Sequence, residues 1–247
     1  MNNPDICLNI VYSVYKKHIR FFSVALKKIE SSPDLTEQVY ERLFEAICVG
    51  QLKPSERVTQ QGLAELLNVS RQPVLQALRL LRKDGFLVDA GRRGLMVAPI
   101  DAVIIRQTYQ VRSVLDGLAA KHAAKTNGRL RSNLIVAGRE AAASGDVSLM
   151  ISADLEFHES IYDLSGNPMI KDATQFHWQH IRRAMGAVVT QLSDMDVIWD
   201  EHELILNAIN AGDDQKAESL ARSHSEGAGE SLAEALEHGR GVWNTQR

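Results

Sequence analysis

The feature that most constrains this chain is a short turn between two predicted helices, the second of which carries arginines along one side. The run "QQGLAELL", residues 60–67, predicts a helix with Thr59 as its N-cap, and "NVS" predicts a tight turn after it. Ser70 is a favourable N-cap for the next helix, worth about 1 kcal/mol, and Pro73 falls in the first turn, where proline is tolerated. Gly85 ends this second helix.

The second helix has two faces of opposite character. Apolar residues at i, i+3, i+4 and i+7 spacing predict its buried face, namely Val74, Ala77, Leu78 and Leu81. The opposite face carries Arg71, Leu75, Arg79 and Arg82, with Gln72 and Gln76 on its flanks. An apolar residue in the middle of this polar face requires a specific explanation.

The flanking segments complete a small domain. Residues 36–49 have the apolar spacing of an amphipathic helix, and residues 51–58 read as a loop because Pro54 disfavours helix. Two β-prone runs, 86–88 and 95–97, surround a turn rich in glycine and arginine, which predicts a hairpin with a basic tip. Three helices followed by such a hairpin predict a winged helix–turn–helix.

This arrangement fits DNA binding. Arginine and glutamine at a helix N-terminus can read guanine and adenine edges in the major groove, and arginines on a wing can contact phosphate or the minor groove. The predicted DNA-binding residues are Ser70, Arg71, Gln72, Leu75, Arg79, Arg92, Arg93 and Gly94. The alternative is a solvated basic helix in an unrelated all-α fold, which the order of the elements disfavours.

From Asp101 onward the chain reads as six helical segments separated by Gly, Asn, Asp and Pro signals, with no convincing strand. The fold class is therefore mainly α: a winged helix–turn–helix followed by an all-α effector-binding bundle. Residues 36–98 hold nine Lys/Arg against seven Asp/Glu (+2), whereas residues 99–247 hold fourteen against twenty-one (−7). This asymmetry suggests different partners for the two parts.

The remaining composition indicates the class of protein. At 247 residues and 45% hydrophobic, the chain can bury a substantial core, and two cysteines indicate no disulfide framework, as in a reducing cytoplasm. The sequence contains no run of eighteen or more apolar residues, so no membrane span is predicted. Basic residues interrupt the apolar run near the N-terminus and no small-residue cleavage site follows, so a signal peptide is rejected there.

One set of polar residues in the bundle has metal-ligand character. Asp154 and His158 lie at i and i+4 on one helix face, His202 lies at the start of a later helix, and His224 lies midway along the last. Three imidazoles and a carboxylate suit Zn²⁺ or Ni²⁺. Each histidine taken singly is more often structural, and His177 and His180 are interpreted as ordinary bundle residues or, at most, pocket lining.

The front part resembles the DNA-binding domain of the GntR family of bacterial transcription regulators. The resemblance rests on the helix–G–x–L–x–P opening, the "LAELLNVSRQPV" core and the "LRKDGFL" close, over about sixty residues. The family usually has arginine where this chain has Leu75. Leucine cannot make an arginine–guanine contact but can pack against a thymine methyl group, which implies an altered operator.

The back part resembles the FCD effector domain of the FadR-like branch of that family, through "VRSVLDGLAAKHAA", "DLEFHESIYDLSGNP" and "DEHELILNAINAGDDQKAESLARSH". The resemblance implies a metal site at Asp154, His158, His202 and His224, and a carboxylate effector held with the help of Arg112. Asp116 stands where glutamate is commoner. Asn167 is expected to be a helix cap or turn former.

These observations predict a ligand-responsive regulator, with repression the expected mode, that binds double-stranded operator DNA as a homodimer. Its partners are a divalent metal ion, Zn²⁺ or Ni²⁺, and a small carboxylate. The predicted domains are an extension of unknown role (1–34), the winged helix (35–98), the FCD-like domain (99–240) and a tail (241–247). Two alternatives stay open: a regulator with a purely structural metal and a dimerising bundle, and a metal-dependent hydrolase.

Overall fold

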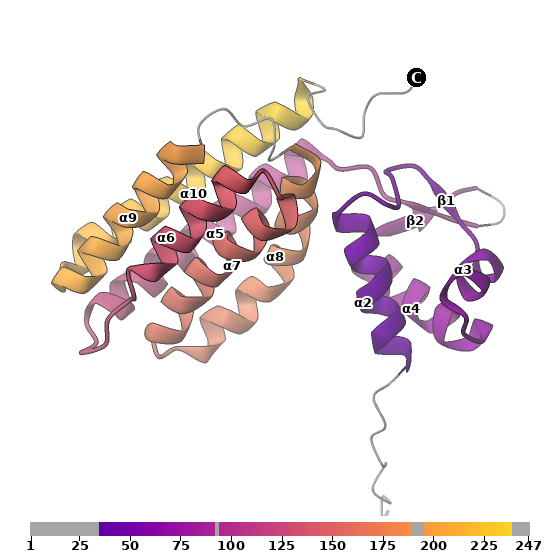
Figure 1. Cartoon of the computed structure of the whole chain (residues 1–247), viewed down its shortest axis with the longest axis horizontal. Coiled ribbons are helices and arrows are strands. Elements are labelled where there is room, and N and C mark those ends of the chain that lie inside the picture. Colours follow the sequence, from indigo (N-terminus) through magenta and orange to yellow (C-terminus); the bar gives the residue numbers. More distant parts are fainter. Residues whose placement is uncertain (1–34, 92–93, 189–194, 239–247) are drawn as a thin grey trace, which may run out of the picture. The chain divides into compact units, whose positions relative to one another are not determined.

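A computed structural model describes residues 35–91, 94–188 and 195–238 of the chain (Figure 1). The predicted N-terminal extension, the C-terminal tail and the two wing arginines, Arg92 and Arg93, lie outside the described residues. Within the described part, no helix is both long enough and apolar enough to span a membrane.

Three helices form the first part of the winged helix: α2 (Leu35–Cys48), α3 (Gln60–Leu67) and α4 (Arg71–Lys83). The predicted cap of α3 is confirmed, because Thr59 Oγ1 accepts a hydrogen bond from Gly62 N at 3.1 Å. The chain turns after α3 through Asn68, which has a left-handed backbone with φ of 52°. Ser70 occupies the cap position of α4, but its hydroxyl makes no capping hydrogen bond, so the predicted stabilisation from that bond is wrong.

The wing is an antiparallel hairpin of β2 (Leu87–Asp89) and β3 (Leu95–Val97), in which Val88 lies opposite Met96. A third strand, β1 (Arg57–Val58), pairs with β3 and gives the strand order β1-β3-β2. The prediction of a plain loop over 51–58 was therefore wrong at its end. Two residues are too few to show a strand pattern in sequence, and the pairing partners lie 37 and 39 residues away along the chain.

The predicted buried face of α4 is confirmed. Val74, Ala77, Leu78 and Leu81 are all buried, and they join a core formed with α2 and the sheet. Phe44 of α2 packs edge-on against Phe86, with ring centroids 5.1 Å apart. Burial of this face leaves the opposite face of α4 directed away from the core.

Six helices form the bundle, as predicted (Figure 1). They are α5 (Ala102–Ala124), α6 (Asn133–Ser144), α7 (Val147–Leu164), α8 (Pro168–Val188), α9 (Met195–Ala211) and α10 (Asp214–Glu237). Asn167 caps α8 through its Oδ1, which accepts from Met169 N at 3.1 Å, in agreement with the predicted capping role.

Helices α5 and α10 approach each other closely because small residues lie between them. A Cβ atom added at Gly229 of α10 would lie 2.4 Å from the Cβ of Tyr109, and one added at Gly117 of α5 would lie 3.2 Å from the carbonyl oxygen of Glu218. Ala120, Ala217 and Ala221 are buried nearby on the same two helices. Any larger side chain at these glycines would push the helices apart.

A buried polar network joins three helices around Asp116 of α5. One carboxylate oxygen accepts from the Tyr162 hydroxyl of α7 at 2.5 Å, and the other accepts from Ser225 Oγ of α10 at 2.5 Å. Arg112 Nε lies 3.0 Å from the same Oδ2, and both members of this ion pair are 2% exposed. The Asp116 carboxylate therefore contacts three residues of the bundle interior.

We expect Asp116→Ala to lower the free energy of unfolding by about 3–5 kcal/mol, because it leaves the buried Arg112 charge without its partner. The matched control is Asp163→Ala, which removes the exposed ion pair with Lys171 and is expected to cost less than about 1 kcal/mol. Urea denaturation followed by circular dichroism measures both. Equal, small losses in the two variants would show that the network does not hold the bundle together.

Candidate functional site

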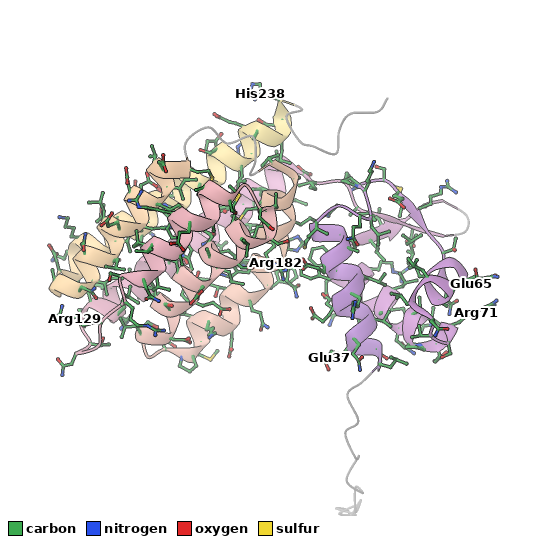
Figure 2. The ribbon with its side chains drawn as sticks, viewed as in Figure 1. Glu37, Glu65, Arg71, Arg129, Arg182 and His238 are labelled. Atoms are coloured by element: carbon green, nitrogen blue, oxygen red, sulfur yellow. The ribbon has the colours of Figure 1, made fainter. Side chains whose placement is uncertain are left out.

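The predicted DNA-reading face of α4 is open to solvent. Arg71, Gln72 and Arg79 are exposed and Leu75 is half-buried between them. Figure 2 shows Arg71 projecting away from the helices at the start of α4. The turn before the helix is fixed by Gln60, whose Nε2 donates to the Arg71 carbonyl oxygen at 2.7 Å. The helix N-terminus is thus presented in a defined orientation, as base reading requires.

Gly94 is the predicted DNA-binding residue of the wing that lies within the described part of the chain. Gly94 has a φ of 123°, which is in the region that favours glycine, and its carbonyl oxygen accepts from Ala90 N at 3.0 Å. This bond joins the two ends of the wing turn between β2 and β3. Gly94 therefore shapes the turn. In the sequence, it was predicted as a DNA-binding residue because it directly follows Arg92 and Arg93.

Three histidines from three helices meet in the bundle interior. His158 of α7, His202 of α9 and His224 of α10 are buried and each offers a ring nitrogen, all within 4.8 Å of one another. The Nε2 atoms of His202 and His224 are 3.0 Å apart. His202 lies in the middle of α9 and not at its start, so it reaches the interior from a well-formed helix.

Asp154 lies beside this cluster, as the i, i+4 spacing predicts. Its Oδ1 is 3.6 Å from His202 Nε2 and 4.0 Å from His158 Nε2. The structure thus brings together all four residues predicted as metal ligands. Burial raises the pKa of Asp154, while the charges of Arg112 and His224 oppose that rise.

Burial also keeps two of the histidines in the neutral form. It lowers the pKa values of His158 and His202 well below the usual 6.5, and the nearby Arg112 charge lowers both further. A neutral imidazole is the form that binds a metal ion. The imidazoles of His158 and His202 can therefore bind a metal ion at neutral pH without first losing a proton.

The donor set fits a divalent metal ion. Two ring nitrogens 3.0 Å apart can both lie about 2.1 Å from one ion, which is the usual zinc–nitrogen distance. His158 Nε2 is buried and has no hydrogen-bond partner among the described residues, an arrangement that a metal ion would relieve. Three imidazoles with a carboxylate suit zinc or nickel better than calcium or magnesium.

Glu201 is a functional candidate that was missed from the sequence. Its Oε2 lies 2.7 Å from His224 Nδ1, so it can accept that proton and direct Nε2 toward the cluster. Carboxylates often orient metal-binding histidines in this way. The partner residue lies on α10, twenty-three positions later, so local spacing carried no signal; the adjacent His202 was the available hint.

Arg112 lies at the edge of the same site. Its guanidinium carbon lies 4.0 Å from the ring centre of Trp178 and 5.2 Å from that of Tyr109. A cavity of about 440 Å³ is lined by Arg112, Asp154, His158 and His224, among others. The predicted effector residue and three of the predicted metal ligands therefore face one space.

His177 and His180, both on α8, do not line this cavity, in agreement with their interpretation as bundle residues. His180 stacks on Phe86 with ring centroids 4.9 Å apart, and burial lowers its pKa. Burial lowers the pKa of His177 as well, and its Nδ1 has no hydrogen-bond partner among the described residues. Among the residues that the structure describes, neither histidine belongs to a cluster of possible metal ligands.

Comparison with known proteins identifies a family for both the winged helix and the bundle. Residues 35–97 match the family described as "Bacterial regulatory proteins, gntR family", and residues 107–227 match the FCD domain. The HTH-type transcriptional regulator YdhC of Bacillus subtilis is 26% identical over 208 residues, covering 82% of this chain and 93% of that protein.

Two further relatives extend the comparison. A Paenarthrobacter nicotinovorans protein named "Probable D-xylose utilization operon transcriptional repressor" is 26% identical, covering 77% of this chain and 85% of that protein. The solved structure of E. coli McbR/YncC shares the fold with a TM-score of 0.68 and 21% identity, covering 82% of this chain and 98% of that one.

The relatives are regulators and not enzymes, which removes support from the metal-dependent hydrolase even though Glu201 supplies a carboxylate beside the cluster. FCD domains commonly bind metal, and the three-histidine cluster could hold one here. The chain belongs to the GntR family of bacterial regulatory proteins, as a DNA-binding transcription regulator with an FCD domain.

Proposed function

We propose that this protein is a ligand-responsive repressor, working in the cytoplasm, whose bundle binds Zn²⁺ or Ni²⁺ and a small organic acid. The observation that carries the proposal is the single cavity faced by both Arg112 and the histidine cluster. A metal ion accepts one carboxylate oxygen as a ligand, and a guanidinium donates hydrogen bonds to a carboxylate. Binding of the acid then changes the affinity for operator DNA.

Helix α8 supports a route from the cavity to the DNA-binding domain. Met185 of α8 lines the cavity, and Arg182, one turn earlier, pairs with Glu45 of α2 at 2.6 Å. An acid that displaces α8 would disturb this pair. If operator affinity did not respond to any of a panel of organic acids, the alternative of a structural metal and a merely dimerising bundle would replace this proposal.

The half-buried position of Leu75 supports an altered base preference at the operator position that this residue contacts. The side chain lies between the exposed Arg71 and Arg79 on the face that we propose enters the major groove. An apolar contact there suits a thymine methyl group, while Arg71 keeps its contacts to guanine or phosphate. The other proposed contacts come from Ser70, Gln72 and the wing residues Arg92, Arg93 and Gly94.

We expect Leu75→Ala to weaken binding to the DNA beside the protein's own gene by about 1 kcal/mol, roughly fivefold, and to relax the base preference at one position. Arg71→Ala should weaken binding and also reduce the salt dependence by about one unit of slope. Fluorescence anisotropy at two salt concentrations, with a shuffled fragment of equal length, measures both effects. Leu149→Ala, at an exposed leucine of the bundle, is the control. Unchanged affinity and base preference in Leu75→Ala would refute the thymine contact.

The exposed face of α5 supports a homodimer. Ile104, Val111 and Leu118 are spaced seven residues apart and, with Val114, are exposed to solvent in the described part of the chain. Apolar residues at this spacing form a seam for a second helix. Two-fold pairing of such a patch would present two recognition helices to a palindromic operator.

Sedimentation velocity is expected to show a dimer at micromolar concentration for the wild type and a monomer for Val111→Glu, because a charge in an apolar interface is costly to bury. Val136→Glu places the same charge on an exposed valine of α6 and should leave the dimer intact. Dimers in both variants would exclude the α5 face as the interface.

The metal proposal predicts one equivalent of Zn²⁺ or Ni²⁺ per chain after dialysis, measured by elemental analysis. His224→Ala should lose the metal, because it removes one of three clustered ring nitrogens, whereas His122→Ala, at an exposed histidine of α5, should keep it. Glu201→Gln should bind metal about 10–100-fold more weakly, since it weakens the bond that orients His224. Full metal content in His224→Ala would contradict the proposed site.

A further inference from the structure

The cavity is lined by a buried guanidinium that has a donor to spare. Arg112 is 2% exposed, and its Nη2 has no hydrogen-bond partner among the described residues. A buried guanidinium nitrogen without a partner is costly, and a ligand oxygen would relieve that cost. Stacking on Trp178 holds the guanidinium in position, so this donor is pre-oriented for its ligand.

The wall of the cavity is apolar and adaptable. Methionines from three different helices line it: Met150 of α7, Met185 of α8 and Met195 of α9. Trp199 and Leu232 add rigid apolar surface. Thioether side chains bend to fit irregular apolar shapes and contact aromatic rings favourably. These residues would leave a hydroxyl or carboxylate without a partner.

The charged groups elsewhere in the cavity repel a second carboxylate. Among the lining residues that the structure describes, Arg112 is the only lysine or arginine, and it is already paired with Asp116. The other polar lining residues outside the metal cluster are Tyr109, Glu201, Ser231, Glu234 and the exposed His238, so two further carboxylates face a second acid group. An acid with two carboxylates would bring its second charge toward these glutamates or into the apolar wall, and either position is unfavourable.

We propose that the effector is a monocarboxylic acid with an apolar body, and not a di- or tricarboxylate or a sugar acid. This inference rests on the proposed function, since it assigns the class of ligand to the same site. The carboxylate contacts Arg112 and the metal centre, while the body of the acid packs among the three methionines. The cavity volume of about 440 Å³ lies within the usual range for small-molecule pockets.

Isothermal titration calorimetry of the zinc-loaded full chain tests the inference with three eight-carbon probes. Octanoate has one carboxylate, suberate has two, and octanamide has none. We expect octanoate to bind once per chain, at least tenfold more tightly than suberate or octanamide. Glu234→Gln should tighten suberate binding severalfold more than octanoate binding, because it removes repulsion of the second carboxylate. Glu140→Gln, at an exposed glutamate of α6, should change neither.

The outcomes separate this inference from the proposed function. Suberate binding as tightly as octanoate would overturn the apolar monocarboxylate and leave an organic-acid site standing. Octanamide binding as tightly as octanoate would refute the role of Arg112 as the carboxylate contact. If none of the probes, and no member of a broader acid panel, bound or raised the melting temperature, both the inference and the proposed effector site would fail.

Discussion

The bundle depends on one buried carboxylate. Asp116 accepts hydrogen bonds from hydroxyls on α7 and α10 and pairs with Arg112 on its own helix. In a low-dielectric interior such a group is stabilising only if every partner is present. The same network shapes the site, because it fixes the Arg112 guanidinium, which lines the cavity, and because Asp116 Oδ2 lies 3.7 Å from His158 Nδ1. Stability and ligand binding therefore share the same atoms.

Sequence periodicity was sufficient to predict most of the fold. The buried face of α4, the cap at Thr59 and the six helices of the bundle follow from local patterns that each carry a physical cause. Failures occurred where a feature depends on a distant partner. The two-residue strand β1 exists because β3 is beside it, and the Ser70 hydroxyl had the right residue type without the required geometry. Tertiary contacts override such local preferences.

The candidate site shows the same division. The Asp154–His158 spacing is local and readable, but the choice of His202 and His224 over His177 and His180 came from family resemblance. The roles of Glu201 and Tyr162 could not be read from the sequence, because each is defined by a residue on another helix. The function of a polar residue depends on the residues that the fold places beside it. The burial of an apolar residue can be predicted from the periodicity of the sequence.

The close contact of α5 with α10 has a consequence for how such a site can change. Glycine at 229 brings the α10 backbone against Tyr109, so no flexible side chain separates the two helices there. The spacing of α5 and α10 at this contact therefore cannot adjust to a new ligand by a change of rotamer. The three methionines on α7, α8 and α9 can do so. Adaptation to a different effector is then easiest at positions 150, 185 and 195, while the spacing of α5 and α10 at Gly229 stays fixed.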